Sequence, residues 1–286
     1  MKKLTSLILT GVLSCTLLAG CAGSGTATTP NTDASTAPQT DTVEGTTITV
    51  GATPAPHAEI LEVVKDVLAD QGITLEIKQY NDYIQPNNAV EDGSLDANYF
   101  QHITYMNDFN EQNGTHLVSV AEVHYEPFGL YAGKTASLDE LADGAQIGVP
   151  NDATNEARAL LLLQQEGLIT LKEDAGITAT VNDITDNPKN LEIVEMEAAQ
   201  LPLRLADLDL AVINGNYAID AGLSVADALA VESADGEAAQ AYVNVLTVKE
   251  GREDDPAIQA LAEALCSDEV KAFMEETYGG AVVPVF

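Results

Sequence analysis

The sequence from Thr46 onward predicts an α/β fold, in which helices cover sheets of mostly parallel strands. Short β-rich runs alternate with amphipathic helical runs along this whole stretch, and such alternation is typical of layered α/β proteins. The chain has 286 residues, of which 45% are hydrophobic, so it can bury a sizeable core. Its length favours about two domains.

The strands are predicted from short apolar runs rich in β-branched residues. Residues 73–80, ITLEIKQY, alternate between apolar and polar side chains, as expected of a half-buried strand. The other predicted strands are 46–52, 94–100, 145–150, 190–196, 208–215 and 241–250, with further strands inside 116–133.

The helices are predicted from apolar residues that recur on one face of a helical turn. In residues 56–72 this face carries Ile60, Val64 and Leu68, and Gly72 is a suitable residue to end the helix. Further helices are predicted over 102–113, within 150–169, over 256–265 and over 268–278.

The net charge excludes one class of partner. With 12 basic and 45 acidic residues, the chain carries a formal charge of -33. A surface this acidic repels phosphate backbones, so we expect no nucleic-acid binding. The charge is consistent with solubility and does not indicate the sign of any ligand.

The N-terminus has the pattern of a signal peptide. Lys2 and Lys3 precede an uncharged apolar stretch, which is too short and wrongly flanked for a membrane span. The stretch ends in LLAGC, which resembles a bacterial lipobox and predicts cleavage before Cys21 and lipidation of its thiol. An ordinary secretory signal followed by a chance cysteine is the alternative. Residues 1–20 are therefore predicted to be a signal peptide.

Residues 21–45 are predicted to be the lipidated cysteine and a disordered tether. The segment is rich in Thr, Ala, Ser and Pro and has few large apolar residues, so it cannot bury a core. A diacylglycerol-modified cysteine carries two acyl chains, which suffice for stable anchoring. We expect the folded part to stay at the extracytoplasmic face of the cell membrane, attached through this lipid.

Arg158 stands near the start of the helix predicted within 150–169, where the helix dipole disfavours a cation. Asp152 or Thr154 can cap this helix. Ligands of open α/β sheets bind beyond the carboxyl ends of strands, and a guanidinium there can grip a carboxylate. The alternative is a surface arginine paired with Glu156 or Glu166, and local chemistry leaves both possibilities open.

Other chemistries find little support in the sequence. The histidines His57, His102, His116 and His124 form no metal-binding spacing, and no nucleophile elbow, P-loop or dinucleotide motif is present. Cys266 lies on an apolar helical stripe and is expected to be a buried structural thiol. The sequence therefore predicts no metal site, no cofactor and no enzymatic activity.

Several runs, in order along the chain, carry a family resemblance. They are GATPAPHAEIL, DYIQPNNAVEDGSLDANYFQH, PNDATNEARALLLLQQEGLI, NPKNLEIVEMEAAQL, DLAVINGNYA, YVNVL and GGAVVPVF. Together they resemble the NlpA-type methionine-binding lipoproteins, the substrate-binding subunits of methionine ABC importers. The resemblance covers nearly all of the chain after the tether.

This resemblance implies a two-lobed periplasmic-binding-protein-like fold of type II. Two α/β domains would be joined by two crossover segments, near EPFGLY and AYVNVL, with the ligand in the cleft between them. Lobe 1 would combine 46–128 with 246–286, and lobe 2 would comprise 129–245.

The resemblance also implies which residues bind the ligand. An aromatic set would form the walls of a pocket for an unbranched thioether, although the same residues could be plain core or helix surface. The polar set would hold the backbone groups of an amino acid, with Arg158 on the carboxylate. The implied ligand-binding residues are Phe100, His102, Tyr105, Asn155, Arg158, Asn214 and Asn244.

The expected function is capture of methionine, most simply L-methionine, and its delivery to an ABC transporter permease by a monomeric receptor. One alternative is another small ligand on the same scaffold, such as a different amino acid, a methionine derivative or a methionine-containing dipeptide. A second is a surface interaction lipoprotein without a transport role.

Overall fold

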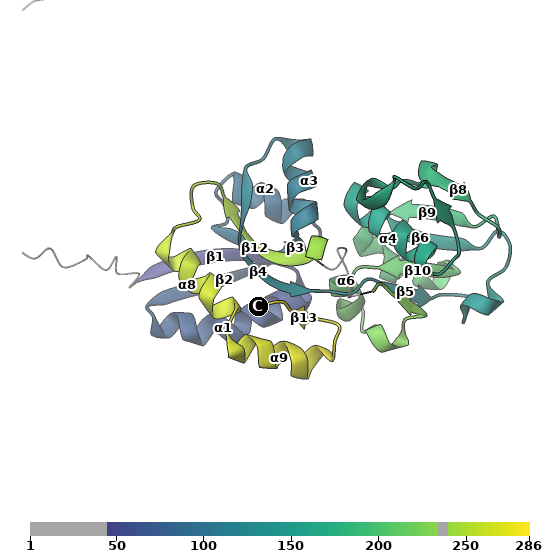
Figure 1. Cartoon of the computed structure of the whole chain (residues 1–286). Coiled ribbons are helices and arrows are strands. Elements are labelled where there is room, and N and C mark those ends of the chain that lie inside the picture. The colour runs from purple at the N-terminus through teal and green to yellow at the C-terminus, as the bar shows by residue number, and fades with distance from the viewer. Residues whose placement is uncertain (1–44, 234–239) are drawn as a thin grey trace, which may run out of the picture. The chain divides into compact units, whose positions relative to one another are not determined.

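The computed structural model describes residues 45–233 and 240–286, and Figure 1 shows the arrangement of their helices and strands. The predicted signal peptide, Cys21 and nearly all of the tether lie outside the described residues. The described part forms two α/β bodies, each built on its own sheet. No described helix has the length and apolar character that a bilayer crossing requires.

The first body is built on a six-stranded sheet in the order β13-β4-β12-β3-β1-β2. Its strands are β1 Thr46–Ala52, β2 Ile73–Gln79, β3 Ala97–His102, β4 Leu117–Tyr125, β12 Val243–Lys249 and β13 Val283–Pro284. β1 runs parallel to β2 and β3, whereas β12 runs antiparallel to β3 and β4.

Helices cover both faces of this sheet (Figure 1). On one face α1 (Glu59–Asp70), α8 (Pro256–Leu265) and α9 (Asp268–Tyr278) form the larger core with β1, β2 and β12. On the other face lie α2 (Gln85–Glu91) and α3 (Ile103–Asn113). The predicted apolar stripe of α1 is buried, and Gly72 follows the helix with a φ of +80°.

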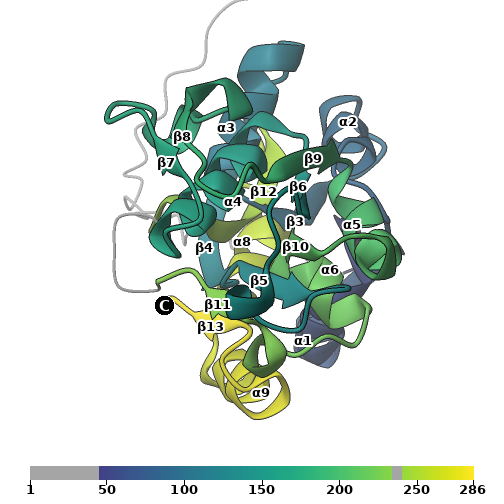
Figure 2. The same ribbon diagram turned by 90° about the vertical axis from the view of Figure 1, so that its right-hand side faces the viewer.

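The second body is built on a five-stranded sheet in the order β11-β5-β10-β6-β9. Its strands are β5 Gly129–Ala132, β6 Gln146–Pro150, β9 Glu192–Met196, β10 Leu210–Ile213 and β11 Ala230–Val231. α4 (Ala153–Gln165) packs on one face, and α5 (Leu201–Arg204) and α6 (Gly215–Asp220) pack on the other (Figure 2).

Short elements complete the described part. β7 (Thr170–Leu171) and β8 (Ile184–Asp186) pair with each other. The short helical turns are η1 Pro54–Ala58, η2 Leu138–Glu140, η3 Gly176–Thr178, η4 Val181–Asp183, η5 Ala198–Gln200, η6 Leu205–Asp207 and η7 Val225–Asp227.

The expectation of mostly parallel sheets is wrong, because both sheets are mixed. β4 leads out of the first sheet toward β5 of the second, and β12 returns to the first sheet after β11. A strand that leaves a sheet and a strand that returns to it run in opposite directions, so β4 and β12 pair antiparallel. Both changes of sheet fall near the segments expected to cross.

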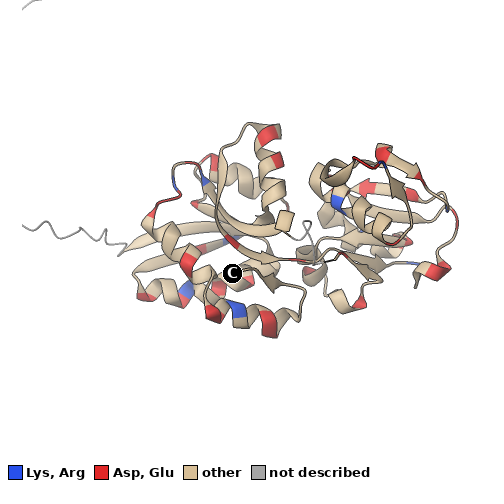
Figure 3. Cartoon of the chain, viewed as in Figure 1, with Lys and Arg blue, Asp and Glu red and all other residues tan. Residues whose placement is uncertain are grey.

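The lobe boundaries at 128/129 and 245/246 stay predictions. β12 already begins at Val243 within the first sheet, which places its first residues with that body. Acidic residues occur along the backbone of both bodies (Figure 3).

Candidate functional site

Residues of both bodies line a common cavity. The cavity contains all seven residues implied by the family resemblance, together with five that were not expected. The lining residues are Tyr83, Phe100, Gln101, His102, Tyr105, Glu126, Asn155, Arg158, Asn214, Gly215, Asn216 and Asn244.

β3 and the first turn of α3 present one wall of the cavity. His102 is both the last residue of β3 and the N-cap of α3, and its Nδ1 accepts a hydrogen bond from the backbone N–H of Tyr105 at 3.0 Å. Burial lowers the pKa of His102 to about 3, so the ring is neutral and its proton is on Nε2. Nε2 therefore donates to Asn155 Oδ1 at 3.2 Å.

Three aromatic rings form an apolar corner of the cavity. The ring centroid of Tyr83 lies 5.7 Å from those of Phe100 and Tyr105, and the last two are 6.4 Å apart. Such spacings are those of ring pairs in contact. The corner suits a soft, unbranched apolar group, and sulfur in particular gains from aromatic neighbours.

Arg158 projects from α4 and is buried, with 5% of its side chain exposed. Asp152 caps this helix by accepting a hydrogen bond from the Asn155 N–H at 3.0 Å. The surface pairing with Glu156 or Glu166 is therefore wrong, because the side chain lies inside and its partner is Glu232. Glu232 follows β11 and has no local sequence pattern that would connect it to α4.

The ion pair between Arg158 and Glu232 is bidentate. Nε donates to Glu232 Oε2 at 2.8 Å, and Nη2 donates both to Glu232 Oε1 and to the backbone carbonyl of Glu126. The rings of Tyr242, Phe128 and Tyr125 surround the guanidinium at 4.4, 4.7 and 5.6 Å. Nη1 makes no hydrogen bond with any described residue, although Arg158 lines the cavity.

Two buried amide atoms in the cavity wall lack a hydrogen-bond partner among the described residues: Asn214 Oδ1 and Asn216 Nδ2. The other polar atom of each amide is hydrogen-bonded, and this bond fixes the orientation of the amide. Asn214 Nδ2 donates to Asn155 Oδ1 at 2.8 Å, and Tyr83 OH donates to Asn216 Oδ1 at 2.6 Å. An unpaired buried polar atom costs about 1–3 kcal/mol. These two atoms therefore offer one acceptor and one donor to a ligand.

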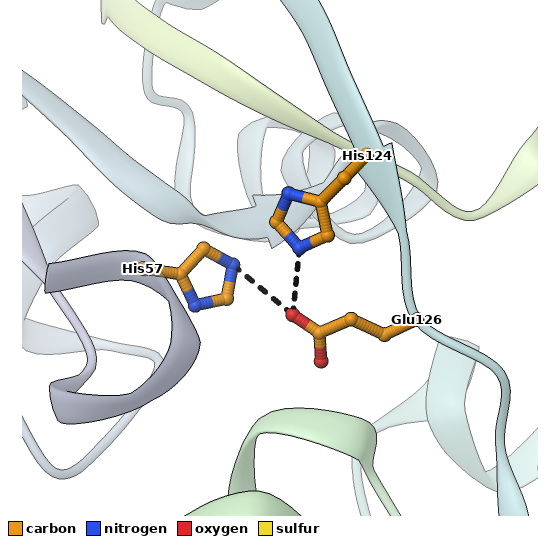
Figure 4. Close-up of side chains that lie close together, drawn as sticks. All are labelled: His57, His124 and Glu126. Carbon is orange, nitrogen blue, oxygen red and sulfur yellow. Dashed lines mark hydrogen bonds and ion pairs between the residues drawn. The ribbon is translucent and has the colours of Figure 1, made fainter. Parts of the chain in front are cut away.

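A cluster of His57, His124 and Glu126 adjoins the cavity, and Figure 4 shows both rings directed at the same carboxylate. Glu126 Oε1 lies 2.8 Å from His124 Nε2 and 3.4 Å from His57 Nε2. Burial lowers the pKa of His57 to about 4 and that of His124 to about 3, which keeps both rings neutral. Burial also raises the pKa of Glu126, and the His57 ring and the Arg158 charge oppose this rise.

The distances in this cluster favour hydrogen bonds over a bound ion. Ligand atoms around one tetrahedral Zn²⁺ stand roughly 3.3 Å apart, since each bond is about 2.0–2.1 Å long. The 2.8 Å separation of His124 Nε2 and Glu126 Oε1 is instead the length of a hydrogen bond. The ring atoms Nδ1 of both histidines are occupied by the hydroxyl groups of Thr53 and Tyr99. That the chain holds no metal stays a prediction.

Some of the lining residues that were not predicted could have been found from the sequence. Glu126 stands in the expected crossover EPFGLY, and Gly215 and Asn216 directly follow Asn214 at the end of a predicted strand. Residues beyond strand ends gather at one edge of a sheet, where ligands bind. Tyr83 and Glu232 carried no such signal.

Two α/β bodies, a chain that passes between them twice, and a buried polar cavity lined by both define a two-lobed substrate-binding protein. The particular family follows from direct comparison. The chain belongs to the NlpA lipoprotein family, whose family model matches residues 48–286.

Solved structures of relatives agree with this assignment. A putative lipoprotein from Ruminococcus gnavus is 57% identical, with a TM-score of 0.83 over 84% of this chain and 99% of that one. A nutrient-binding protein from Burkholderia cenocepacia bound to methionine is 43% identical, with a TM-score of 0.80 over 84% and 100% of the two chains. A periplasmic substrate-binding protein of an ABC transporter from Coxiella burnetii is also 43% identical, with a TM-score of 0.78 over 83% and 100%.

Proposed function

We propose that this protein is an extracytoplasmic, lipid-anchored receptor that captures methionine and delivers it to an ABC importer. Membership of the NlpA lipoprotein family and the similarity to a methionine-bound nutrient-binding protein support this function. The observation that carries it is the pairing, in one cavity, of an aromatic corner with an unpaired buried donor and an unpaired buried acceptor. A zwitterionic amino acid with an apolar side chain has matching groups.

The backbone groups of methionine would fill the polar end of the cavity. Its carboxylate would accept from Asn216 Nδ2, which has no hydrogen-bond partner among the described residues, and from the Arg158 guanidinium, which lines the cavity. Its ammonium would donate to Asn214 Oδ1. A zwitterion needs partners for both charges once it is buried, and this arrangement supplies them.

Asn155 and Asn244 have different roles in this arrangement. Asn155 Oδ1 already accepts from His102 and Asn214, and its Nδ2 donates to Asp152. It therefore acts by holding its neighbours in place. Asn244 Oδ1 faces His57 Nε2 at 3.1 Å, which leaves its amide N–H groups for the ligand.

The thioether would occupy the corner formed by Tyr83, Phe100 and Tyr105. Contact between sulfur and an aromatic ring contributes about 0.3–1.5 kcal/mol, and the apolar chain adds roughly 0.8 kcal/mol per buried methylene group. A branched or charged side chain gains less in this corner, which favours methionine over most other amino acids.

The proposed receptor also has a lipid anchor and a surface for the permease. Cys21 is the lipidation site, the folded part stays at the outer face of the cell membrane, and the closed lobes present their surface to the permease. The receptor acts as a monomer, and it binds and releases its ligand without chemical change. No cofactor, metal or nucleic acid takes part in this mechanism.

Titration calorimetry of the purified protein tests the function. We expect L-methionine to bind, with D-methionine, a methionine-containing dipeptide and leucine as competitors that define the selectivity. Asn214→Ala and Asn216→Ala each remove one group matched to the ligand and should weaken binding about 10-fold. The matched control is Asn107→Ala on the exposed side of α3.

Each outcome separates the alternatives. Binding of only other amino acids or peptides would assign the scaffold to a different ligand. A chain that binds none of these, and that shows no co-purified ligand in native mass spectrometry, would instead be an interaction lipoprotein.

A further inference from the structure

We propose that Glu126 is a further ligand-binding residue, which pairs with the ammonium group of the ligand while His57 and His124 hold its carboxylate in place. This inference rests on the proposed function, because it assumes an amino-acid ligand. It defines the substrate class as amino acids with a free, charged amino group.

Glu126 is the acidic side chain among the described residues that line the cavity. It stands at the junction of the two bodies, directly after β4, and only 6% of its side chain is exposed. The other ionised group in the wall, Arg158, already has its charge matched by Glu232, which lies outside the lining. A cation that enters the cavity therefore meets one carboxylate that has only neutral partners among the described residues.

Neutral donors hold this carboxylate from two sides. Oε1 faces the Nε2 atoms of His124 and His57, whose other ring nitrogens meet the hydroxyl groups of Tyr99 and Thr53. The backbone N–H of Asn216 in α6 also favours the ionised form of this carboxylate and lowers its pKa. Because a carboxylate accepts about four hydrogen bonds, capacity remains for the ammonium of a ligand.

Gly215 shows how closely the carboxylate and α6 approach. A Cβ atom added at Gly215 would lie 2.7 Å from both Cβ and Oε2 of Glu126. Glu126 therefore contacts α6 directly at Gly215, and the residue before Gly215 is Asn214, which lines the same cavity and has an unpartnered Oδ1 among the described residues. Together they can surround one ammonium group.

The electrostatic environment of Glu126 also favours a bound ammonium group. Burial raises the pKa of Glu126 because the ionised form loses its hydration. An ammonium group beside it would favour the ionised form and lower that pKa again. The ligand cation and the buried anion therefore stabilise each other, which neither an N-acylated nor a deaminated analogue can do.

The test compares two ligands that differ in the amino group alone: L-methionine and 4-(methylthio)butanoate. For the wild-type protein we expect methionine to bind at least 10-fold more tightly in titration calorimetry. For Glu126→Gln we expect the affinity for methionine to fall about 10- to 100-fold, while the affinity for 4-(methylthio)butanoate stays within about two-fold. The control is Glu122→Gln at an exposed position of β4, which should change neither affinity.

His124→Asn tests the positioning role. It should reduce the preference for methionine over 4-(methylthio)butanoate, and it should add little further loss in the Glu126→Gln background, because both changes remove the same interaction. A structural role alone would weaken both ligands equally and add fully to Glu126→Gln.

Two results would overturn the inference. One is equal loss of both ligands in Glu126→Gln that is correctly folded by circular dichroism. The other, which needs no variant, is equal binding of the two ligands by the wild-type protein. If Glu126→Gln does not fold, Glu126→Asp keeps the charge and withdraws it by one methylene group, and the same ligand comparison applies. Failure of wild-type protein to bind methionine would refute the proposed function instead.

Discussion

At the scale of single residues, Arg158 shows how the interior uses one of the 12 basic residues of a chain with 45 acids. Its guanidinium is enclosed by three rings and paired with Glu232, so its charge is neutralised within the protein. A buried pair of this kind contributes little net stability compared with apolar residues, but loss of one partner leaves an isolated buried charge. The pair therefore fixes the orientation of Nη1 more than it stabilises the fold.

Arg158→Ala should lower the free energy of unfolding by about 3–5 kcal/mol, because it leaves the Glu232 carboxylate buried without a cation, held only by the Tyr125 hydroxyl and the Phe128 N–H among the described residues. The double variant Arg158→Met, Glu232→Gln should recover most of this stability. It should nevertheless bind methionine more weakly than wild type, because no guanidinium remains to hold the carboxylate. Urea denaturation and calorimetry measure the two effects. Arg204→Ala, which breaks an exposed pair with Asp207, is the control and should cost at most about 1 kcal/mol. Wild-type affinity in the double variant would contradict the role of Arg158.

The buried histidines make stability depend on pH. Burial lowers the pKa of His57 from 6.5 to about 4, and those of His102 and His124 to about 3. Between these values and 6.5 the unfolded chain binds protons that the folded chain does not, so stability is present above pH 6.5 and is lost as the pH falls. Each histidine contributes about 1.4 kcal/mol per pH unit in this window.

Urea denaturation at a series of pH values between 7 and about 4.5 should therefore show a falling free energy of unfolding. Glu126 and Asp152 act in the opposite direction, because burial raises their pKa values and favours protonation in the folded state. A stability that rises on acidification would mean that these carboxyl groups outweigh the histidines. His57→Asn should flatten the slope.

At the scale of elements, α6 connects the second body to the cavity. It has six residues, and its N-cap Asn214 makes no capping hydrogen bond with its own side chain. An asparagine at this position commonly accepts from the N–H groups of the next turn. In this helix the Asn214 amide is turned toward Asn155, which leaves Oδ1 for the cavity at the expense of local helix stability.

Gly215→Ala should weaken methionine binding by at least 10-fold, because the new Cβ would lie 2.7 Å from Glu126 and push α6 away from the cavity. The backbone of Gly215 does not have a positive φ, so the substitution acts through this close approach and not through backbone strain. Calorimetry measures the effect, with Asp220→Ala at the exposed end of α6 as the control. Unchanged affinity in Gly215→Ala would show that α6 can shift without cost.

At the scale of the whole described chain, direct contacts join the two bodies around the cavity. Tyr83 from the first body stacks on Tyr217 of α6 with ring centroids 5.0 Å apart, and its hydroxyl group donates to Asn216. The Tyr217 hydroxyl donates in turn to the Asn81 carbonyl at 3.2 Å. These contacts describe a closed receptor, in which the protein itself supplies part of the energy of closure.

The sequence predicted the parts of this molecule that local pattern determines. The apolar stripes of α1, α8 and α9 follow from periodicity, whereas Asn214, the residue beyond β10, was implied only by the family resemblance. α2 and α6 were missed because seven and six residues are too few to show a helical period. The antiparallel pairing of β12 and the contact of Arg158 with Glu232, 74 positions away, depend on chain crossings that no local pattern encodes.

The contacts of Tyr83 lead to a prediction about closure. If methionine binds the closed form, its apparent affinity is the intrinsic affinity multiplied by the closed fraction of the free receptor. Tyr83→Phe removes the hydrogen bond to Asn216 and keeps the stack on Tyr217, so it should weaken binding a few-fold. Tyr83→Ala removes the hydrogen bond and the stack, and it should weaken methionine binding by at least a further 10-fold. Part of this loss comes from the missing contact between the Tyr83 ring and the thioether.

Small-angle scattering separates closure from contact. Tyr83→Ala should have a larger radius of gyration than wild type without ligand, and saturating methionine should bring the two to the same value. Tyr278→Phe, whose hydroxyl group contacts Glu59 on the first body away from the cavity, is the control and should leave both measurements unchanged. Equal radii without ligand, combined with weaker binding, would assign Tyr83 to the thioether pocket alone. In that case closure would depend on the remaining contacts, chiefly those of His102 with Asn155 and of Glu126 with α6.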